Sequence, residues 1–183
     1  MEVEKLRGEY EIEVDWQPFF LRPETPPEGS PLPEYIKQKV RDPNNPLKAR
    51  AAREGLKMQF RDITPSTRRA HEAVEFAREK GRLAPLHASL LKRYWEESQD
   101  LYAMETLRGA AVDAGLDPDE LLGAIQRGDY RQRVEQLVAQ AQQMGVSAVP
   151  TFVLGDKFGI QGAQELPTFR HAMERLGAKP KAS

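Results

Sequence analysis

The chain has 183 residues, a formal net charge of −1 and no cysteine. That length suits one domain with a core, or a small core that carries an insertion, rather than two independent domains. The near-neutral charge excludes the broad basic surface that drives nonspecific binding to nucleic acid or membranes, so we expect neither as a partner. The N-terminus lacks an apolar signal segment and no apolar run could span a membrane, which predicts a cytoplasmic protein.

A short helix and a strand are predicted first. Met1–Arg7 is predicted to be a helix that ends at Gly8, a residue suited to that position. Glu11–Leu21 alternates apolar and acidic residues and then reaches an aromatic pair, which predicts a strand with one apolar face. A helix without a strand before it suggests that a strand is missing upstream.

The middle of the chain is predicted to be helical after a loop that is rich in proline. Pro23–Pro46 contains seven prolines, which predicts a loop with at most a short helix at Glu34–Val40. Apolar residues with helical spacing follow from Leu86 onward. Asp117-Pro118-Asp119-Glu120 has the pattern of a capped helix start, and a longer amphipathic helix is expected over about Asp129–Met144.

The C-terminal part predicts a β-hairpin and a final helix. Thr151–Leu154 and Phe158–Ile160 are short apolar runs on either side of a Gly-Asp turn. Pro150 stands at the hairpin entrance, where a residue without an N–H donor is tolerated. The final helix is predicted over about Glu165–Leu176 and stops at Gly177. A strand, a long helical crossing and a second strand indicate parallel pairing and an α/β fold.

Segments spread along the chain share the order and spacing of a known family: Trp16–Pro23 with Pro26–Gly29, Ala70–Ala73, Gly145–Val153 and Gly159–Gln164. Together they resemble the DsbA-like branch of the thioredoxin superfamily. The resemblance spans nearly the whole chain. It is closest to the cytosolic branch that is related to 2-hydroxychromene-2-carboxylate isomerases and kappa-class glutathione transferases.

This resemblance implies an α/β fold with a thioredoxin-like sheet that is incomplete at its N-terminus and interrupted by an all-helical insertion. Residues 1–32 and 129–183 would form the discontinuous core, and residues 33–128 would form the helical insertion subdomain. The resemblance also implies a cis peptide bond before Pro150. The backbone of Val149 would then pair with an extended substrate segment, so Val149 and Pro150 are the expected substrate-binding residues.

One motif that the family carries is absent from this sequence. In the family a Cys-x-x-Cys lies between the first strand and the first helix, whose N-terminus stabilises the attacking thiolate. This chain has neither that motif nor the serine of the isomerase relatives, so we expect it to begin inside that helix, roughly 15 to 20 residues late. No catalytic residue is assigned, and the 183 residues are expected to be redox-inactive.

Three functions stay open. The first is a DsbA-like thiol-disulfide oxidoreductase that lacks its cysteine pair and acts on an extended peptide or protein substrate. The second is a glutathione-dependent isomerase or transferase of the 2-hydroxychromene-2-carboxylate isomerase type, for which glutathione would supply the sulfur. The third is a noncatalytic peptide-binding module. Glutathione is therefore the one cofactor considered, and a homodimer is left open.

No metal site is expected. His71-Glu72-x-x-Glu75 resembles a zinc-protease helix, but a glutamate occupies the position of the second histidine. His87 and His171 have no ligand spacing. Ser147 lies before the hairpin and is interpreted as a loop hydroxyl that bonds to the backbone rather than as a nucleophile.

Overall fold

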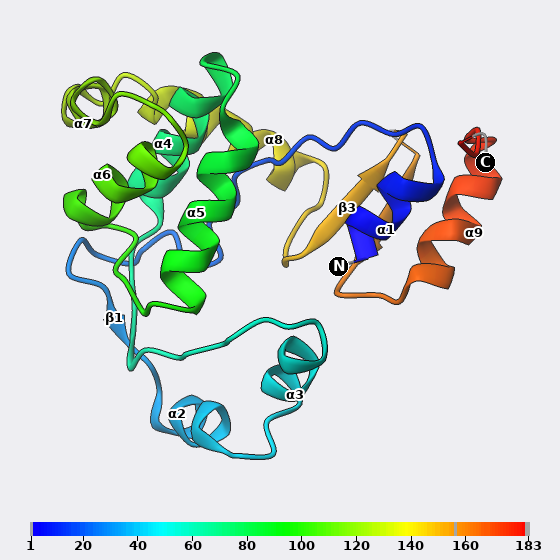
Figure 1. Ribbon diagram of the computed structural model, residues 1–183, viewed down its shortest axis with the longest axis horizontal. Coiled ribbons are helices and arrows are strands. Elements are labelled where there is room, and N and C mark those ends of the chain that lie inside the picture. Colours follow the sequence, from blue (N-terminus) through cyan, green and yellow to red (C-terminus); the bar gives the residue numbers. More distant parts are fainter. Residues whose placement is uncertain (1, 156, 182–183) are drawn as a thin grey trace. The chain divides into compact units, whose positions relative to one another are not determined.

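The computed structural model describes residues 2–155 and 157–181 (Figure 1). Contacts between Cα atoms divide the chain into two compact units. We call Met1–Leu21 with Val138–Ser183 the hairpin unit and Arg22–Leu137 the helical unit. The sequence places the boundaries at residues 32/33 and 128/129, and the helical unit extends beyond both positions.

The hairpin unit contains a two-stranded antiparallel ribbon that two helices cover on one face (Figure 1). Side chains alternate across a strand, so the facing pairs Phe152–Ile160 and Leu154–Phe158 point to the same side. The two helices lie on that side and contact each other. The elements are α1 (Glu2–Glu9), β3 (Thr151–Leu154), β4 (Phe158–Gln161) and α9 (Leu166–Leu176).

The core of the hairpin unit is small and partly aromatic. Leu6 and Tyr10 from the N-terminal part meet Phe169 and Met173 of α9. Phe152 of β3 packs edge to face on Phe169, with ring centroids 4.9 Å apart. Such a pair contributes about 0.5–1.5 kcal/mol beyond the burial of its area. The ribbon is therefore held by one face, and its other face lies outside this core.

The helical unit is organised around α4 (Arg68–Glu79), where seven of twelve residues are buried. A helix buried over so much of its circumference belongs at the centre of a bundle, and α5 and α7 pack against it (Figure 1). No helix in the described residues is long and apolar enough to cross a bilayer. The other helices are α2 (Glu34–Arg41), α3 (Pro46–Arg53), α5 (Leu83–Trp95), α6 (Met104–Asp113), α7 (Pro118–Arg127) and α8 (Arg131–Gln143), which continues into the hairpin unit.

Helix caps explain where several of these elements begin and end. The Asp117 carboxylate accepts hydrogen bonds from the second and third N–H groups beyond it, at 2.8 and 3.1 Å, so α7 starts as predicted. α9 and the β3–β4 hairpin also lie where the sequence predicts them. α1 differs, because it runs through Gly8 rather than ending there. The N–H of Tyr10 donates to the Leu6 carbonyl at 2.9 Å and continues the helical pattern beyond the glycine.

The predicted strand over Glu11–Leu21 is wrong, since the structure has no strand in these residues. Tyr10 forms one isolated antiparallel bridge with Pro180, and the predicted parallel pairing with the hairpin is absent from the described residues. Ile12 nevertheless packs against the hairpin core. The alternation thus indicates burial, whereas a strand also needs a ladder partner for its N–H and C=O groups.

The proline-rich region contains two features that the sequence analysis misses. α3 begins at Pro46, after Asn45, whose side chain accepts hydrogen bonds from the next two N–H groups of the helix at 2.8 and 3.3 Å. This is the same cap-and-proline signature that predicts α7. The second feature is an antiparallel pair of two-residue strands, β1 (Ser30–Pro31) and β2 (Ile63–Thr64), which are too short to show a period in the sequence.

Candidate functional site

The hairpin entrance is shaped by the turn between α8 and β3. Gly145 follows the helix with φ of 81°, a left-handed conformation that residues with a side chain rarely adopt. The peptide bond between Val149 and Pro150 is cis. Thr151 Oγ1 donates to the Ala148 carbonyl oxygen at 2.7 Å, which ties this turn to the first residue of β3.

The register of the ribbon determines which backbone groups of β3 point away from β4. In an antiparallel pair, residues that exchange hydrogen bonds with the partner strand alternate with residues whose N–H and C=O point outward. Gly162 N–H donates to the Pro150 carbonyl oxygen at 2.8 Å, so this pair is of the first kind. Along the same register Phe152 also bonds to β4, whereas Thr151 and Val153 face outward. Within the described residues β3 has no second strand beside it.

The side chains next to these outward groups are apolar and accessible. Val149 is 48 % exposed and Val153 is 42 % exposed. Val153 lies opposite Gly159, so the neighbouring position of β4 has no side chain to cover it. We call the segment Val149–Val153 the outer edge of β3. Unpaired backbone groups next to accessible apolar side chains are the features that permit addition of another strand.

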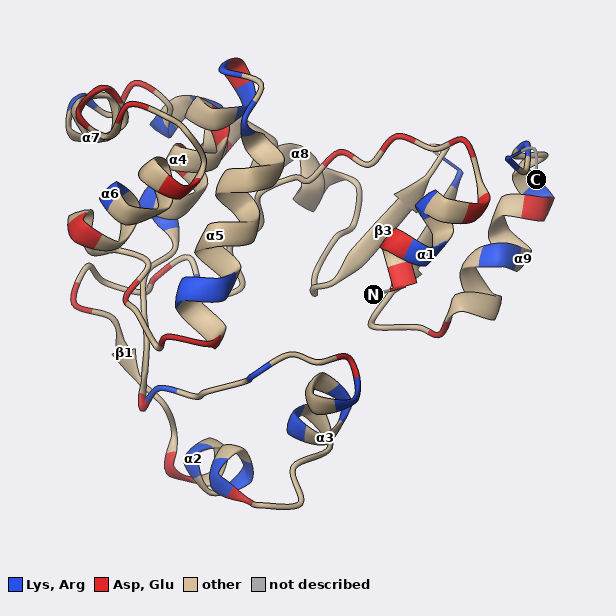
Figure 2. Cartoon of the chain, in the orientation of Figure 1, with Lys and Arg blue, Asp and Glu red and all other residues tan. Residues whose placement is uncertain are grey.

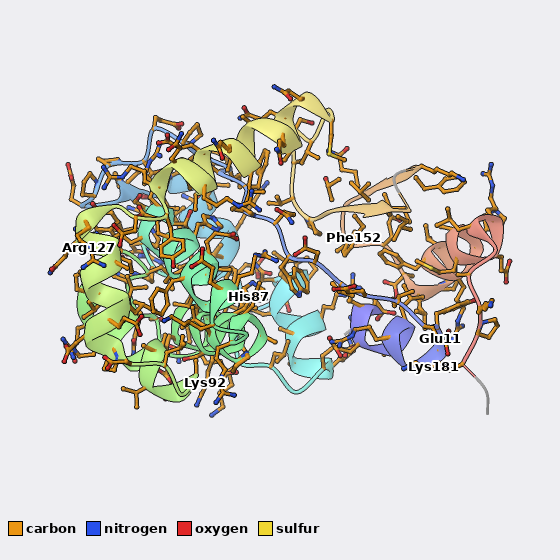
Figure 3. All side chains as sticks on the ribbon, turned by 90° about the horizontal axis from the view of Figure 1, so that it is seen from above. Glu11, His87, Lys92, Arg127, Phe152 and Lys181 are labelled. Carbon is orange, nitrogen blue, oxygen red and sulfur yellow. The ribbon has the colours of Figure 1, made fainter. Side chains whose placement is uncertain are left out.

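An ion pair between α1 and α9 supports the ribbon on its covered face. Arg170 Nε donates to Glu9 Oε2 at 2.7 Å, and a second guanidinium nitrogen donates to Glu9 Oε1. These hydrogen bonds lower the pKa of Glu9. A bidentate pair fixes the relative orientation of the two helices. Through α9 it also fixes the surface on which Phe152 packs (Figure 3).

The sequence names Val149 and Pro150 as the expected substrate-binding residues, and the structure places both in exposed positions directly before β3. It brings them next to Thr151 and Val153, which the sequence analysis misses. The outward positions of Thr151 and Val153 could have been predicted from the sequence. The Gly-Asp turn is recognisable in the sequence, and counting back from it in steps of two identifies the outward positions of the strand.

The histidines lie on separate helices and form no ligand cluster. His71 is on α4, His87 on α5 and His171 on α9. Within residues 2–155 and 157–181, no three histidine or carboxylate side chains come together as metal ligands. Burial lowers the pKa of His87, which favours its neutral form. Ser147 is exposed in the loop before the hairpin.

Two buried glutamates on α4 are the least expected ionisable groups. Glu75 is 3 % exposed; its Oε1 accepts a hydrogen bond from Arg78 Nε at 3.2 Å, and its Oε2 lies 3.8 Å from Arg133 Nε. Glu72 is 4 % exposed, and its Oε1 lies 3.9 Å from Arg131 Nε. Its Oε2 is buried without a hydrogen-bond partner among the described residues. Burial accordingly raises the pKa of Glu72.

Known proteins share this architecture. The crystal structure of a probable DsbA oxidoreductase from Streptomyces coelicolor is similar, with a TM-score of 0.83 and 27 % identity, over 94 % of this chain and 79 % of that one. The uncharacterized protein YwbO of Bacillus subtilis (strain 168) is 27 % identical over 173 residues, which are 93 % of this chain and 84 % of that protein. A structure of 2-hydroxychromene-2-carboxylate isomerase shares the fold, with a TM-score of 0.66 and 21 % identity, over 78 % of this chain and 69 % of that one.

Residues 1–174 match the family described as DSBA-like thioredoxin domain. The match covers both units, so the helical unit belongs to the family pattern as well as the hairpin unit. The α/β class with a helical insertion, expected from the sequence, is confirmed. The chain therefore belongs to the DSBA-like thioredoxin domain family.

Proposed function

We propose that the outer edge of β3 binds an extended peptide or protein segment by strand addition. The observation that supports this proposal is the outward backbone of Thr151 and Val153, which has no ladder partner in the described residues. An incoming strand would exchange hydrogen bonds with these groups. Its alternate side chains would meet Val149 and Val153, which favours apolar or β-branched residues at those positions.

Replacing Val153 by proline tests this proposal. Proline removes an N–H that points away from β4, so the hairpin keeps its own ladder while the edge loses a donor. We expect Val153→Pro to weaken the binding of an extended, valine-rich peptide at least about tenfold, measured by fluorescence anisotropy. Val153→Ala keeps the N–H and should lose less affinity.

The matched control is Gly159→Pro. Gly159 lies opposite Val153 and its N–H points to the other edge of the ribbon, beyond β4. This variant should bind the peptide as the wild type does. Equal binding by the wild type and Val153→Pro would contradict strand addition at β3, and loss of binding in Gly159→Pro alone would assign the peptide to β4.

We further propose that these 183 residues do not catalyse thiol-disulfide exchange by themselves. Exchange proceeds through a mixed disulfide, which requires a thiolate on the catalyst. The sequence has no cysteine to supply one. In an insulin reduction assay with dithiothreitol, the rate with the protein should equal the rate without it. Turnover above that background would refute this part of the proposal.

Glutathione is a second candidate ligand for the same edge. Its backbone is a short extended peptide, and it would bring the sulfur that the chain lacks. Binding should be detectable by isothermal titration at millimolar glutathione and should be weakened in Val153→Pro. A protein that binds the peptide but shows no heat with glutathione would favour the noncatalytic peptide-binding function.

A further inference from the structure

One region of the helical unit is rich in basic residues and has few buried ones. The basic arm, residues 34–57, contains α2 and α3 and has seven Lys or Arg against three Asp or Glu, a net charge of +4. The whole chain has a net charge of −1, so the remaining residues together carry −5. Lys and Arg lie on both helices of the arm (Figure 2). The net charge of the arm is thus opposite in sign to the summed charge of the remaining residues.

The basic arm has little buried surface and exposes large apolar side chains. α2 has no buried residue, and Ala51 is the one buried residue of α3. Tyr35 is 62 % exposed and Leu47 is 58 % exposed. Contact with a partner would remove the apolar surface of these two side chains from water.

An acidic segment with complementary properties, residues 11–16, follows α1. Glu11, Glu13 and Asp15 are exposed, and no basic residue interrupts them. The N–H groups of Glu13 and Val14 donate to no backbone carbonyl within the described part of the chain. Trp16, at the end of the segment, is 41 % exposed. This segment therefore offers negative charge, an open backbone and an exposed aromatic ring.

We propose that the basic arm binds the acidic segment of a second copy of this chain, and that two such reciprocal contacts close a dimer. The opposite charges of the basic arm and the acidic segment support this occupant, because both surfaces belong to the same sequence. Two basic arms would repel each other, so the arm meets the acidic segment rather than its own counterpart. Each copy would contribute one basic arm and one acidic segment, and both would be occupied by the same partner. This is the arrangement of a closed two-fold dimer, which does not extend into a fibre.

A charge swap tests this dimer with exposed residues that lie outside the hydrophobic cores of both units. The arm variant carries Lys39→Glu, Arg53→Glu and Lys57→Glu, which reverses the sign of the arm to a net charge of −2. The segment variant carries Glu11→Lys and Glu13→Lys, which gives the segment a net charge of +1. In a dimer of either variant with itself, the arm and the segment that meet would carry charges of the same sign. The dimer dissociation constant of each variant, measured by sedimentation equilibrium, should therefore rise at least about tenfold.

Mixing the two variants distinguishes contacts between copies from contacts within one chain. In a mixed pair both contacts join opposite charges, so the equimolar mixture should regain dimers that neither variant forms alone. At about 1 M salt, where the Debye length is about 3 Å, the wild-type dimer should weaken. A matched control, Lys92→Glu with Arg127→Glu on α5 and α7 (Figure 3), should dimerise as the wild type does.

Three results would overturn the proposal. The wild-type chain could remain monomeric at millimolar concentration. The mixture could remain monomeric although the wild type dimerises, which would place the charge pairing elsewhere. The chain could bind vesicles of phosphatidylserine and phosphatidylcholine through the basic arm and show no self-association. That result would identify a membrane surface, rather than a second copy, as the partner of the arm. Circular dichroism of each variant verifies that its helices are retained.

Discussion

Replacing Glu72 by glutamine should stabilise the helical unit at neutral pH. The Glu72 side chain is 5 % exposed, and its Oε2 has no hydrogen-bond partner in the described residues. An unsatisfied buried polar atom costs about 1–3 kcal/mol, and more when it is charged. The compensating ion pair is weak, because Arg131 Nε lies 3.9 Å away and that side chain is 64 % exposed. Such a screened pair contributes at most about 1 kcal/mol. Glutamine keeps a polar atom at this position but removes the charge, and we expect the variant to gain about 1–2 kcal/mol in free energy of unfolding from the loss of that charge.

The pH dependence of this gain has a defined sign. Burial raises the folded-state pKa of Glu72 above 4.5. Below about pH 4.5 the carboxyl group is protonated in both the folded and the unfolded state, so wild type and variant should differ little. As the pH rises through the folded-state pKa, the folded protein must accommodate a buried charge and loses stability relative to Glu72→Gln. Urea unfolding at about pH 4 and about pH 7.5, followed by circular dichroism, measures both differences.

Glu75→Gln is the matched control for this experiment. Glu75 is buried to the same degree and lies one turn along α4, but each of its oxygens faces an arginine nitrogen, at 3.2 and 3.8 Å. Neutralising it removes a compensated charge and should lower the free energy of unfolding by about 1–3 kcal/mol. The reasoning would be refuted by a Glu72→Gln protein that is less stable than the wild type at neutral pH. A gain in stability that is the same at both pH values would refute it as well.

Two further predictions concern backbone conformation and a tyrosine. Gly29→Ala should lower the free energy of unfolding by more than about 2 kcal/mol, because φ is 83° and a Cβ atom would lie 2.6 Å from a side-chain carbon and 2.8 Å from a backbone oxygen of β2. At Gly55 φ is 73° but no atom lies within 4 Å of the added Cβ, so Gly55→Ala should lower the free energy of unfolding only by the conformational cost of about 1–2 kcal/mol. If Gly29→Ala and Gly55→Ala lower the free energy of urea unfolding equally, the steric explanation for Gly29 is wrong. Burial and a hydrogen bond to the last residue of α4 raise the pKa of Tyr130 to about 12. Burial also raises the pKa of Tyr94, so in an ultraviolet titration the contribution of Tyr130 is the step near pH 12 that Tyr130→Phe removes. Tyr130 should stabilise the fold fully below about pH 10 and lose this effect as the pH rises through 12. If the step that Tyr130→Phe removes lies near pH 10 instead of pH 12, the raised pKa of Tyr130 is excluded.

Local chemistry explains why the start of some helices could be predicted. A side-chain acceptor followed by proline marks the start of α7 at Asp117, and the same signature at Asn45 marks the start of α3. The second was missed because the surrounding prolines favour a loop. Capping depends on only a few neighbouring residues, so it can be recognised without knowledge of the tertiary structure.

The burial of Glu72 and Glu75 could not be predicted in the same way. Charged side chains are rarely buried unless they are paired, and both residues have the spacing of an ordinary solvated helix face. Their burial depends on the helices that pack around α4, and their partners Arg131 and Arg133 lie more than fifty residues away along the chain. Nothing in a single sequence indicates which arginines will meet which carboxylates.

The two predicted strands show the same distinction between local and distant partners. Thr151–Leu154 became a strand because its ladder partner follows after a short turn, so one stretch of sequence encodes both strands. Glu11–Leu21 has an equally clear alternation, and Ile12 is packed as that alternation predicts, yet no strand lies beside it in the described residues. Side-chain periodicity indicates which face is buried, whereas strand formation depends on whether another backbone is available. The hairpin unit therefore presents two stretches of backbone without ladder partners, and the proposed contacts with a peptide and with a second copy are expected at these two places.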